Sequence, residues 1–104
     1  MEVRLFGKYI EDFLHSQPND IKETVFWAIR RLSMYGHELR MPDSKHLGKG
    51  LFELRAIGTS PVRLFYVFKD DTAFILHGFV KKSEKIPARE LETARRRHNA
   101  LARI

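Results

Sequence analysis

The chain has 104 residues, of which 43% are hydrophobic and 12% aromatic, and it contains no cysteine. A chain of this length builds one hydrophobic core. Without cysteine it has no disulfide, no thiolate nucleophile and no cysteine-type zinc site. The N-terminal stretch has an acid at its second position and no continuous apolar run, so we expect no signal peptide, no membrane span and a cytosolic location.

The positive charge of the chain is concentrated toward its C-terminal end. The formal net charge is +6, and residues 81–104 carry eight basic side chains against three acidic ones. A basic segment of this kind suits a nucleic-acid backbone, because each phosphate that it neutralises releases counterions. The same composition is also typical of a solvated helix face or of a surface for an acidic protein, so charge alone leaves these alternatives open.

The first third of the sequence predicts a short strand and two helices. Glu2–Phe6 alternates weakly, as a strand does, and Lys8–Ser16 has apolar residues at helical spacing before a proline ends it. Asp20 and Glu23 have the spacing of a capping box, and Gly36 is a natural end for the second helix. The expected core stripe of this helix is Ile21, Val25, Ala28, Ile29, Leu32 and Tyr35.

The rest of the sequence predicts a loop, three strands and a helix. His37–Gly50 is polar and contains glycine and proline, so it predicts a loop. Alternating strands then follow at Leu51–Ile57, Val62–Lys69 and Thr72–Lys82, with turns at Gly58–Ser60 and Asp70-Asp71. A last helix starts at Pro87. Its apolar stripe is Ala88, Leu91, Ala94, His98 and Leu101, opposite Arg89, Arg96 and Arg103.

These elements predict one α+β domain over residues 1–104. Its sheet is a three-stranded antiparallel meander plus the short N-terminal strand, combined with two N-terminal helices and a C-terminal helix. A three-residue turn at 58–60 pairs Arg55 with Arg63, and a two-residue turn at 70–71 places Gly78 beside Arg63. Strand alternation then puts Lys82 on the same face. We expect this surface to bind an anion, because two opposed arginines repel each other unless negative charge lies between them.

Simpler interpretations of these residues also exist. Arg55 could pair with Glu53 or a loop acid, and Lys82 could be a solvated strand end. The five histidines show no pair at metal-ligand spacing, so no metal site is predicted. We expect His98 to face the core and His77 to pack under a helix. The aromatic residues of the strands are expected in the core rather than on a base-stacking surface.

Four consecutive segments resemble a known family. They are GLFELR (Gly50–Arg55), VRLFYVF (Val62–Phe68), ILHGFVKKSEKIP (Ile75–Pro87) and ARELETARRR (Ala88–Arg97). Together they are similar to the HigB-like, phage-related branch of the RelE/ParE toxin superfamily, over roughly residues 47–97. The resemblance implies the RelE/ParE-like fold and a ribosome-dependent mRNA endoribonuclease, or mRNA interferase. It also implies a type II toxin–antitoxin pair with a helix-turn-helix antitoxin as partner.

The resemblance also implies roles for individual residues. Arg63 matches the catalytic arginine of the family, Arg55 matches a basic position on the preceding strand, and Lys82 lies near the basic positions that close the last strand. RNA can be cut without metal or cofactor when its own 2′-hydroxyl attacks the adjacent phosphate, and arginine is suited to stabilise that charge. We further expect contacts with messenger or ribosomal RNA from the basic side chains of Lys49, Lys81, Lys85, Arg96 and Arg97.

The sequence departs from the family at the expected proton carrier. Several of these nucleases have a tyrosine or histidine just beyond the last strand, where this chain has Ser83–Ile86. Glu53 and Asp43 are alternative candidates for the base, and Lys81, Lys82 or Lys85 for the acid if neighbouring cations lower its pKa. Two other functions stay open: a non-enzymatic DNA gyrase inhibitor of the ParE type, and an inactive nucleic-acid-binding regulator.

Overall fold

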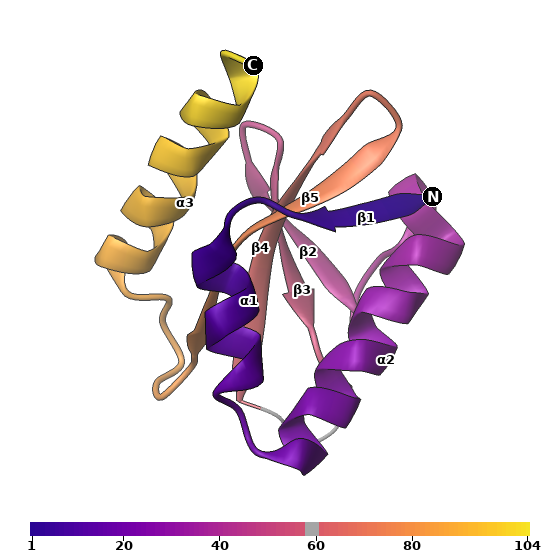
Figure 1. Ribbon diagram of the computed structural model, residues 1–104, viewed down its shortest axis with the longest axis vertical. Helices are drawn as coiled ribbons and strands as arrows, with labels where there is room; N and C mark the ends of the chain where they lie inside the picture. Colours follow the sequence, from indigo (N-terminus) through magenta and orange to yellow (C-terminus); the bar gives the residue numbers. More distant parts are fainter. Residues whose placement is uncertain (58–60) are drawn as a thin grey trace.

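The computed structural model describes residues 1–57 and 61–104 (Figure 1). The turn predicted at Gly58–Ser60 lies outside the described residues. The elements follow the chain in the order β1 (Glu2–Leu5), α1 (Lys8–His15), α2 (Asn19–Tyr35), the short 3₁₀ helix η1 (Gly36–Glu38), β2 (Ser44–Gly48), β3 (Leu51–Arg55), β4 (Val62–Lys69), β5 (Thr72–Val80) and α3 (Ala88–Ala102). The predicted α+β architecture is confirmed.

The strands form one five-stranded sheet in the order β1-β5-β4-β3-β2. β1 is parallel to β5, and the other neighbours are antiparallel. The helices cover both faces, with α1 and α2 on one side and α3 on the other (Figure 1). In the part of the chain that the structure describes, no helix has the length and apolar character that crossing a membrane requires.

Strand alternation divides the apolar side chains between two clusters. The cluster under α1 and α2 includes Leu54, Leu64 and Tyr66, and the cluster under α3 includes Phe65 and Val67. Successive side chains of β4 therefore belong to different clusters, as the period of two requires. Phe65, Tyr66 and Phe79 are core residues, as expected, whereas Phe52, Phe68 and Phe74 are partly buried at the edges of the two clusters.

The segment predicted as a loop at His37–Gly50 contains η1 and the edge strand β2. β2 pairs antiparallel with β3, with Ser44 opposite Leu54 and His46 opposite Phe52. Its side chains at Lys45 and His46 are exposed. An edge strand with one solvated face needs few apolar residues, which is why its composition resembles that of a loop.

Helix boundaries differ slightly from the predicted ones. Pro18 is the N-cap of α2, and no side chain caps this helix, so the predicted capping box of Asp20 and Glu23 is wrong. The last buried residue of α2 is Leu32, and Tyr35, which was predicted to end the core stripe, is 52% exposed. Gly36 ends α2 with a positive φ of 52°, as predicted.

In α3, Pro87 is the N-cap and the helix begins one residue later, at Ala88. The stripe of α3 buries Ala94 and Leu101, with Leu91 and His98 partly buried, but Ala88 is exposed. The helix therefore packs on the sheet through its middle and its C-terminal part.

A β-bulge in β5 changes which residues face which side of the sheet. The predicted turn at Asp70-Asp71 has two residues, both with positive φ, and it sets the expected pairing as far as Tyr66 opposite Ile75. Beyond that point Phe65 pairs with His77, so Leu76 is an extra residue.

The bulge overturns the predicted position of Gly78. Arg63 lies opposite Phe79, and Gly78 lies opposite Leu64, on the face covered by α1. A Cβ at Gly78 would approach the Phe13 ring to 2.8 Å and Leu64 Cδ2 to 2.9 Å. Glycine is therefore required here so that α1 can pack closely on β5.

Candidate functional site

Arg55 and Arg63 are direct neighbours across β3 and β4. They form an opposed pair in the antiparallel register, as the sequence predicts. Both side chains are partly buried on the face of the sheet that carries α3. Side chains of opposed residues lie close together, so two guanidinium groups share a small area of the sheet.

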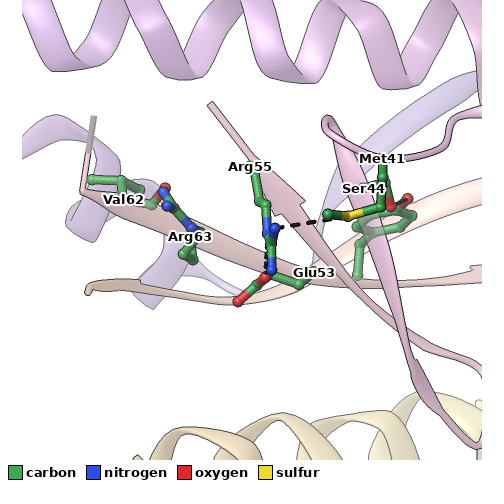
Figure 2. Close-up of polar contacts among 7 residues, drawn as sticks. Met41, Ser44, Glu53, Arg55, Val62 and Arg63 are labelled. Atoms are coloured by element: carbon green, nitrogen blue, oxygen red, sulfur yellow. Dashed lines mark hydrogen bonds and ion pairs between the residues drawn. The ribbon is translucent and has the colours of Figure 1, made fainter. Parts of the chain in front are cut away.

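Glu53 supplies the negative charge that this arrangement needs. Its side chain is fully buried, and its Oε1 accepts a hydrogen bond of 2.7 Å from Arg55 Nε, whose side chain is 24% exposed. Figure 2 shows Arg55 reaching from β3 toward Glu53, with Met41 on its other side and Arg63 on the neighbouring strand. The second oxygen of Glu53 has no hydrogen-bond partner among the described residues.

Arg63 is held in a less solvated environment. Its Nη1 donates a hydrogen bond of 3.0 Å to the carbonyl of Val62. Burial lowers the pKa of the Arg63 guanidinium, the negative charge of Glu53 opposes this effect, and the positive charge of Arg55 adds to it. An arginine still carries its charge at neutral pH, so the site presents a partly desolvated cation.

The turn that precedes β2 fixes the position of Arg55. The Arg55 backbone N–H donates to the Asp43 carbonyl at 2.8 Å, and its Nη1 lies 3.7 Å from the Met41 sulfur. The Asp43 carboxylate forms an ion pair with Arg31 of α2, at 3.1 Å. Both carboxylates considered as a base are therefore engaged: Glu53 with Arg55, and Asp43 with Arg31.

Lys82 does not join the arginine pair in the way the sequence predicts. It follows the end of β5 and is exposed. Because the bulge reverses the alternation, Phe79 shares the Arg63 face, and the next position on that face is Lys81. The Lys81 N–H donates to the Pro61 carbonyl at 2.6 Å, so the pairing with the start of β4 extends to this partly buried lysine.

The residues assigned to RNA binding lie in three different places. Lys81 and Lys85 belong to the segment between β5 and α3, at the end of β4 that carries Arg63. Lys49 is in the β2–β3 turn, at the other end of β3 and roughly 20 Å from Arg55 at about 3.3 Å per residue. Arg96 is exposed on α3, as expected.

Arg97, which we expected to contact RNA from the outer face of α3, faces the sheet instead, so that expectation is wrong. Its Nη1 donates to the Leu76 carbonyl at 2.9 Å and to His77 Nδ1 at 3.0 Å, and its guanidinium lies 3.5 Å from the centre of the Tyr9 ring. The extra residue of the bulge leaves a carbonyl outside the regular ladder, and Arg97 satisfies it. The bulge therefore draws Arg97 inward and joins α3 to β5 and α1.

His77 packs under α3, as the sequence predicts, and belongs to this same cluster. Because a guanidinium can only donate, Nδ1 of His77 is the acceptor, and Nε2–H donates to Glu90 at 3.0 Å. Sequence reasoning missed the cluster, since its members are far apart in the chain. Among the described residues, no group of three or more His, Cys, Asp and Glu side chains could hold a metal ion.

The fold and the arginine pair define a small α+β protein with a cationic site at one end of its sheet. The family named Phage derived protein Gp49-like (DUF891) matches residues 12–99 of the chain. The chain therefore belongs to this family, which is a RelE/HigB-like toxin family. No curated protein matches the chain.

Proposed function

We propose that the protein is the toxin of a type II toxin–antitoxin pair, of the HigB-like branch, and that it cuts mRNA on the ribosome. The observation that carries this proposal is the opposed pair of Arg55 and Arg63, with the buried Glu53 of β3 bound to Arg55. Membership of the Gp49-like family supports it.

The arrangement of charges favours a phosphate as the ligand. A guanidinium forms paired, charge-assisted hydrogen bonds with phosphate oxygens and does not lose its proton. Glu53 neutralises part of the positive charge and orients Arg55 through its Nε, and Nη1 contacts the Met41 sulfur, so Nη2 is the nitrogen of Arg55 that a ligand would engage first. Lys81 is the third cation of the proposed site, in place of Lys82.

The proposed reaction is attack of the RNA 2′-hydroxyl on the adjacent phosphorus. The new O–P bond forms as the bond to the 5′-oxygen breaks, the proton of the 2′-hydroxyl is removed and the 5′-oxygen gains a proton. The products are a 2′,3′-cyclic phosphate and a 5′-hydroxyl. Arg63 and Arg55 stabilise the charge on the phosphate oxygens, and DNA is no substrate because it lacks the 2′-hydroxyl.

The engaged carboxylates support a requirement for the ribosome. With Glu53 bound to Arg55 and Asp43 bound to Arg31, neither is placed as an efficient base. A ribosome that holds the mRNA in a fixed bend would align the 2′-hydroxyl with the phosphate and lower the entropic part of the barrier. A cytoplasmic location and a helix-turn-helix antitoxin complete the proposal.

The test is to induce the chain in bacteria and map the 5′ ends of mRNA, with an assay of gyrase supercoiling in parallel. We expect new 5′-hydroxyl ends and 2′,3′-cyclic phosphates on translated mRNA, and the same ends in a cell-free translation reaction with transition-metal chelators and buffered magnesium. Ends with 5′-phosphate and 3′-hydroxyl would instead indicate water activated by a metal. Inhibited supercoiling without mRNA cleavage would indicate a gyrase inhibitor, and neither effect would indicate a regulatory module.

A further inference from the structure

A pocket lies on the opposite face of the sheet from the arginine pair. It has a volume of about 290 Å³, and its walls come from η1, β2, β3 and β4. The wall residues are His37, Leu39, Arg40, Ser44, His46, Phe52 and Phe68. This volume is at the lower end of the range of small-molecule sites, and it fits one planar group rather than an extended chain.

The pocket combines aromatic rings with positive charge. The His37 ring lies 4.0 Å from the Phe68 ring, and the His46 ring lies 4.7 Å from the Phe52 ring, between centroids. His37, Arg40 and His46 are exposed. None of the lining residues that the structure describes is acidic. Rings in the wall and a cation at the rim favour a ligand that is both aromatic and anionic.

Two polar groups can orient such a ligand. At the bottom of the pocket the buried Ser44 hydroxyl shares a hydrogen bond of 2.5 Å with the Tyr66 hydroxyl. At the rim, Arg40 Nη1 donates to the carbonyls of His37 and Leu39, at 2.5 and 3.1 Å. These bonds hold the guanidinium in place while its Nε and Nη2 have no partner among the described residues.

The turn between η1 and β2 connects this pocket to the arginine pair. Arg40 and Ser44 line the pocket, and between them Met41 contacts Arg55 through its sulfur and Asp43 binds the Arg55 N–H through its carbonyl. An RNA strand held at Arg55 that passes around this turn therefore meets the pocket within a few nucleotides.

We propose that this pocket binds one nucleotide of single-stranded RNA a few nucleotides from the scissile phosphate, with the base against the aromatic wall and a phosphate on Arg40. The inference rests on the proposed function, because it assumes that RNA occupies the arginine pair. Stacking on protein rings tolerates any base, so the pocket requires a base at one position of the strand without selecting its identity.

The experiment uses a 2′-O-methyl RNA pentamer, which binds but cannot be cut, and versions with an abasic site at each position in turn. Binding to the full chain is measured by fluorescence anisotropy and by NMR of the histidine rings at millimolar RNA. We expect one abasic position to weaken binding about 5- to 150-fold. We also expect the His37 and His46 signals to shift with RNA and the His15 signals to stay unchanged.

The variant that tests the pocket is His37→Ala combined with His46→Ala, because both rings are exposed. The double variant should lose the sensitivity to the abasic position, and Arg40→Ala should bind every pentamer more weakly. The matched controls are His15→Ala and Arg30→Ala, which are exposed on α1 and α2. Equal effects of all abasic positions, unshifted His37 and His46 signals, or full sensitivity in the double variant would each overturn the inference.

The outcomes separate this inference from the proposed function. Cleavage of translated mRNA by a protein that shows no position-specific abasic effect would refute the pocket alone. Position-specific binding by a protein that cuts no mRNA would refute the nuclease and leave the pocket as an RNA-binding site.

Discussion

Two glutamate–arginine pairs, each two residues apart in sequence, differ in their surroundings. Glu2 and Arg4 are both more than half exposed, whereas Glu53 is fully buried beside Arg55. An exposed pair contributes little to stability, because water screens both charges. A buried pair costs much more when one partner is removed, since the other charge then lacks its compensation.

We predict that Glu53→Ala lowers the free energy of unfolding by about 3 kcal/mol, at the low end of the range for buried pairs because Arg55 is partly solvated. The control Glu2→Ala should have almost no effect. Urea unfolding of both variants gives the comparison. Equal stabilities of the two variants would mean that water reaches Glu53 and that its charge is not required to hold the two arginines together.

The proposed role of Arg63 predicts a loss of activity without a loss of fold. Arg63→Ala should reduce cleavage of translated mRNA about 100- to 1000-fold, because it removes a contact that strengthens as charge develops in the transition state. Arg63→Lys should recover only part of the rate, since an ammonium group cannot bind two phosphate oxygens in the arginine geometry. Circular dichroism checks the fold, and a folded Arg63→Ala protein with the wild-type rate would contradict the assignment.

The burial of the Tyr66 hydroxyl predicts how the stability of the protein changes at alkaline pH. Burial raises the pKa of its hydroxyl above the ordinary value of 10.0, and the Ser44 hydrogen bond and the charge of Arg40 oppose the shift only in part. The folded state therefore holds the phenolic proton more tightly than the unfolded state. The contribution of the protonated Tyr66 to the free energy of unfolding is fully present below pH 10 and is lost as the pH rises above it.

The measurement is thermal unfolding of wild type and Tyr66→Phe between pH 8 and about pH 11. Tyr66→Phe should be less stable at pH 8, because it lacks the hydrogen bond to Ser44, but its stability should fall less steeply at alkaline pH. Both proteins contain the same lysines, so the difference between the two stability curves reports the ionisation of Tyr66 alone. Parallel curves would show that Tyr66 ionises equally in both states.

At the scale of elements, the bulge in β5 organises the contact between the sheet and α3. It reverses the alternation beyond Leu76, aligns Gly78 with α1 and presents a carbonyl to Arg97. Neighbouring arginines in α3 consequently have different roles: Arg95 donates to the Gly48 and Leu47 carbonyls, Arg96 is exposed, and Arg97 is bound at the bulge.

Substitutions along α3 should reveal this difference. We expect Arg97→Ala to destabilise the protein by about 1.5–3 kcal/mol, because it removes charge-assisted hydrogen bonds to partly buried groups. Arg96→Ala should stay within about 0.5 kcal/mol of wild type. Denaturant unfolding of the two single variants measures both changes in the free energy of unfolding. Equal changes would mean that Arg97 lies in solvent.

At the scale of the whole molecule, the exposed charge of α3 is separate from the arginine pair. Arg89 and Arg96 are exposed on α3, and Arg103, the C-cap of the helix, is exposed seven residues further on. The side of α3 that carries them faces away from the sheet and is available for a large polyanion. We expect it to dock the protein on ribosomal RNA, while the arginine pair acts on the mRNA.

Reversing Arg96 and Arg103 to glutamate tests this division. The double variant should bind ribosomes more weakly and with a flatter salt dependence, because each lost phosphate contact reduces the number of counterions released. Its fold should be unchanged, since both residues are exposed. Lys22→Glu combined with Arg30→Glu on α2 is the control with the same change in charge, and an equal effect of both variants would indicate attraction by net charge alone.

The sequence by itself determined the order and type of most elements and the pairing of Arg55 with Arg63. Local patterns carry this information: the period of the apolar residues, the glycine after α2, and the number of residues between the two arginines in the chain, which predicts the register of β3 and β4. β2 was missed, because an exposed edge strand has the polar composition of a loop.

Only the tertiary structure decided three positions: Gly78 lies opposite Leu64, Lys81 rather than Lys82 lies on the Arg63 face, and Arg97 points toward the sheet. All three follow from one extra residue in β5, and a single residue in a continuous apolar run leaves no periodic signal. The burial of Glu53 and the pocket behind β3 also depend on segments that meet only in the folded chain. Sequence patterns report neighbours along the chain, whereas charge neutralisation and pocket shape depend on neighbours in space.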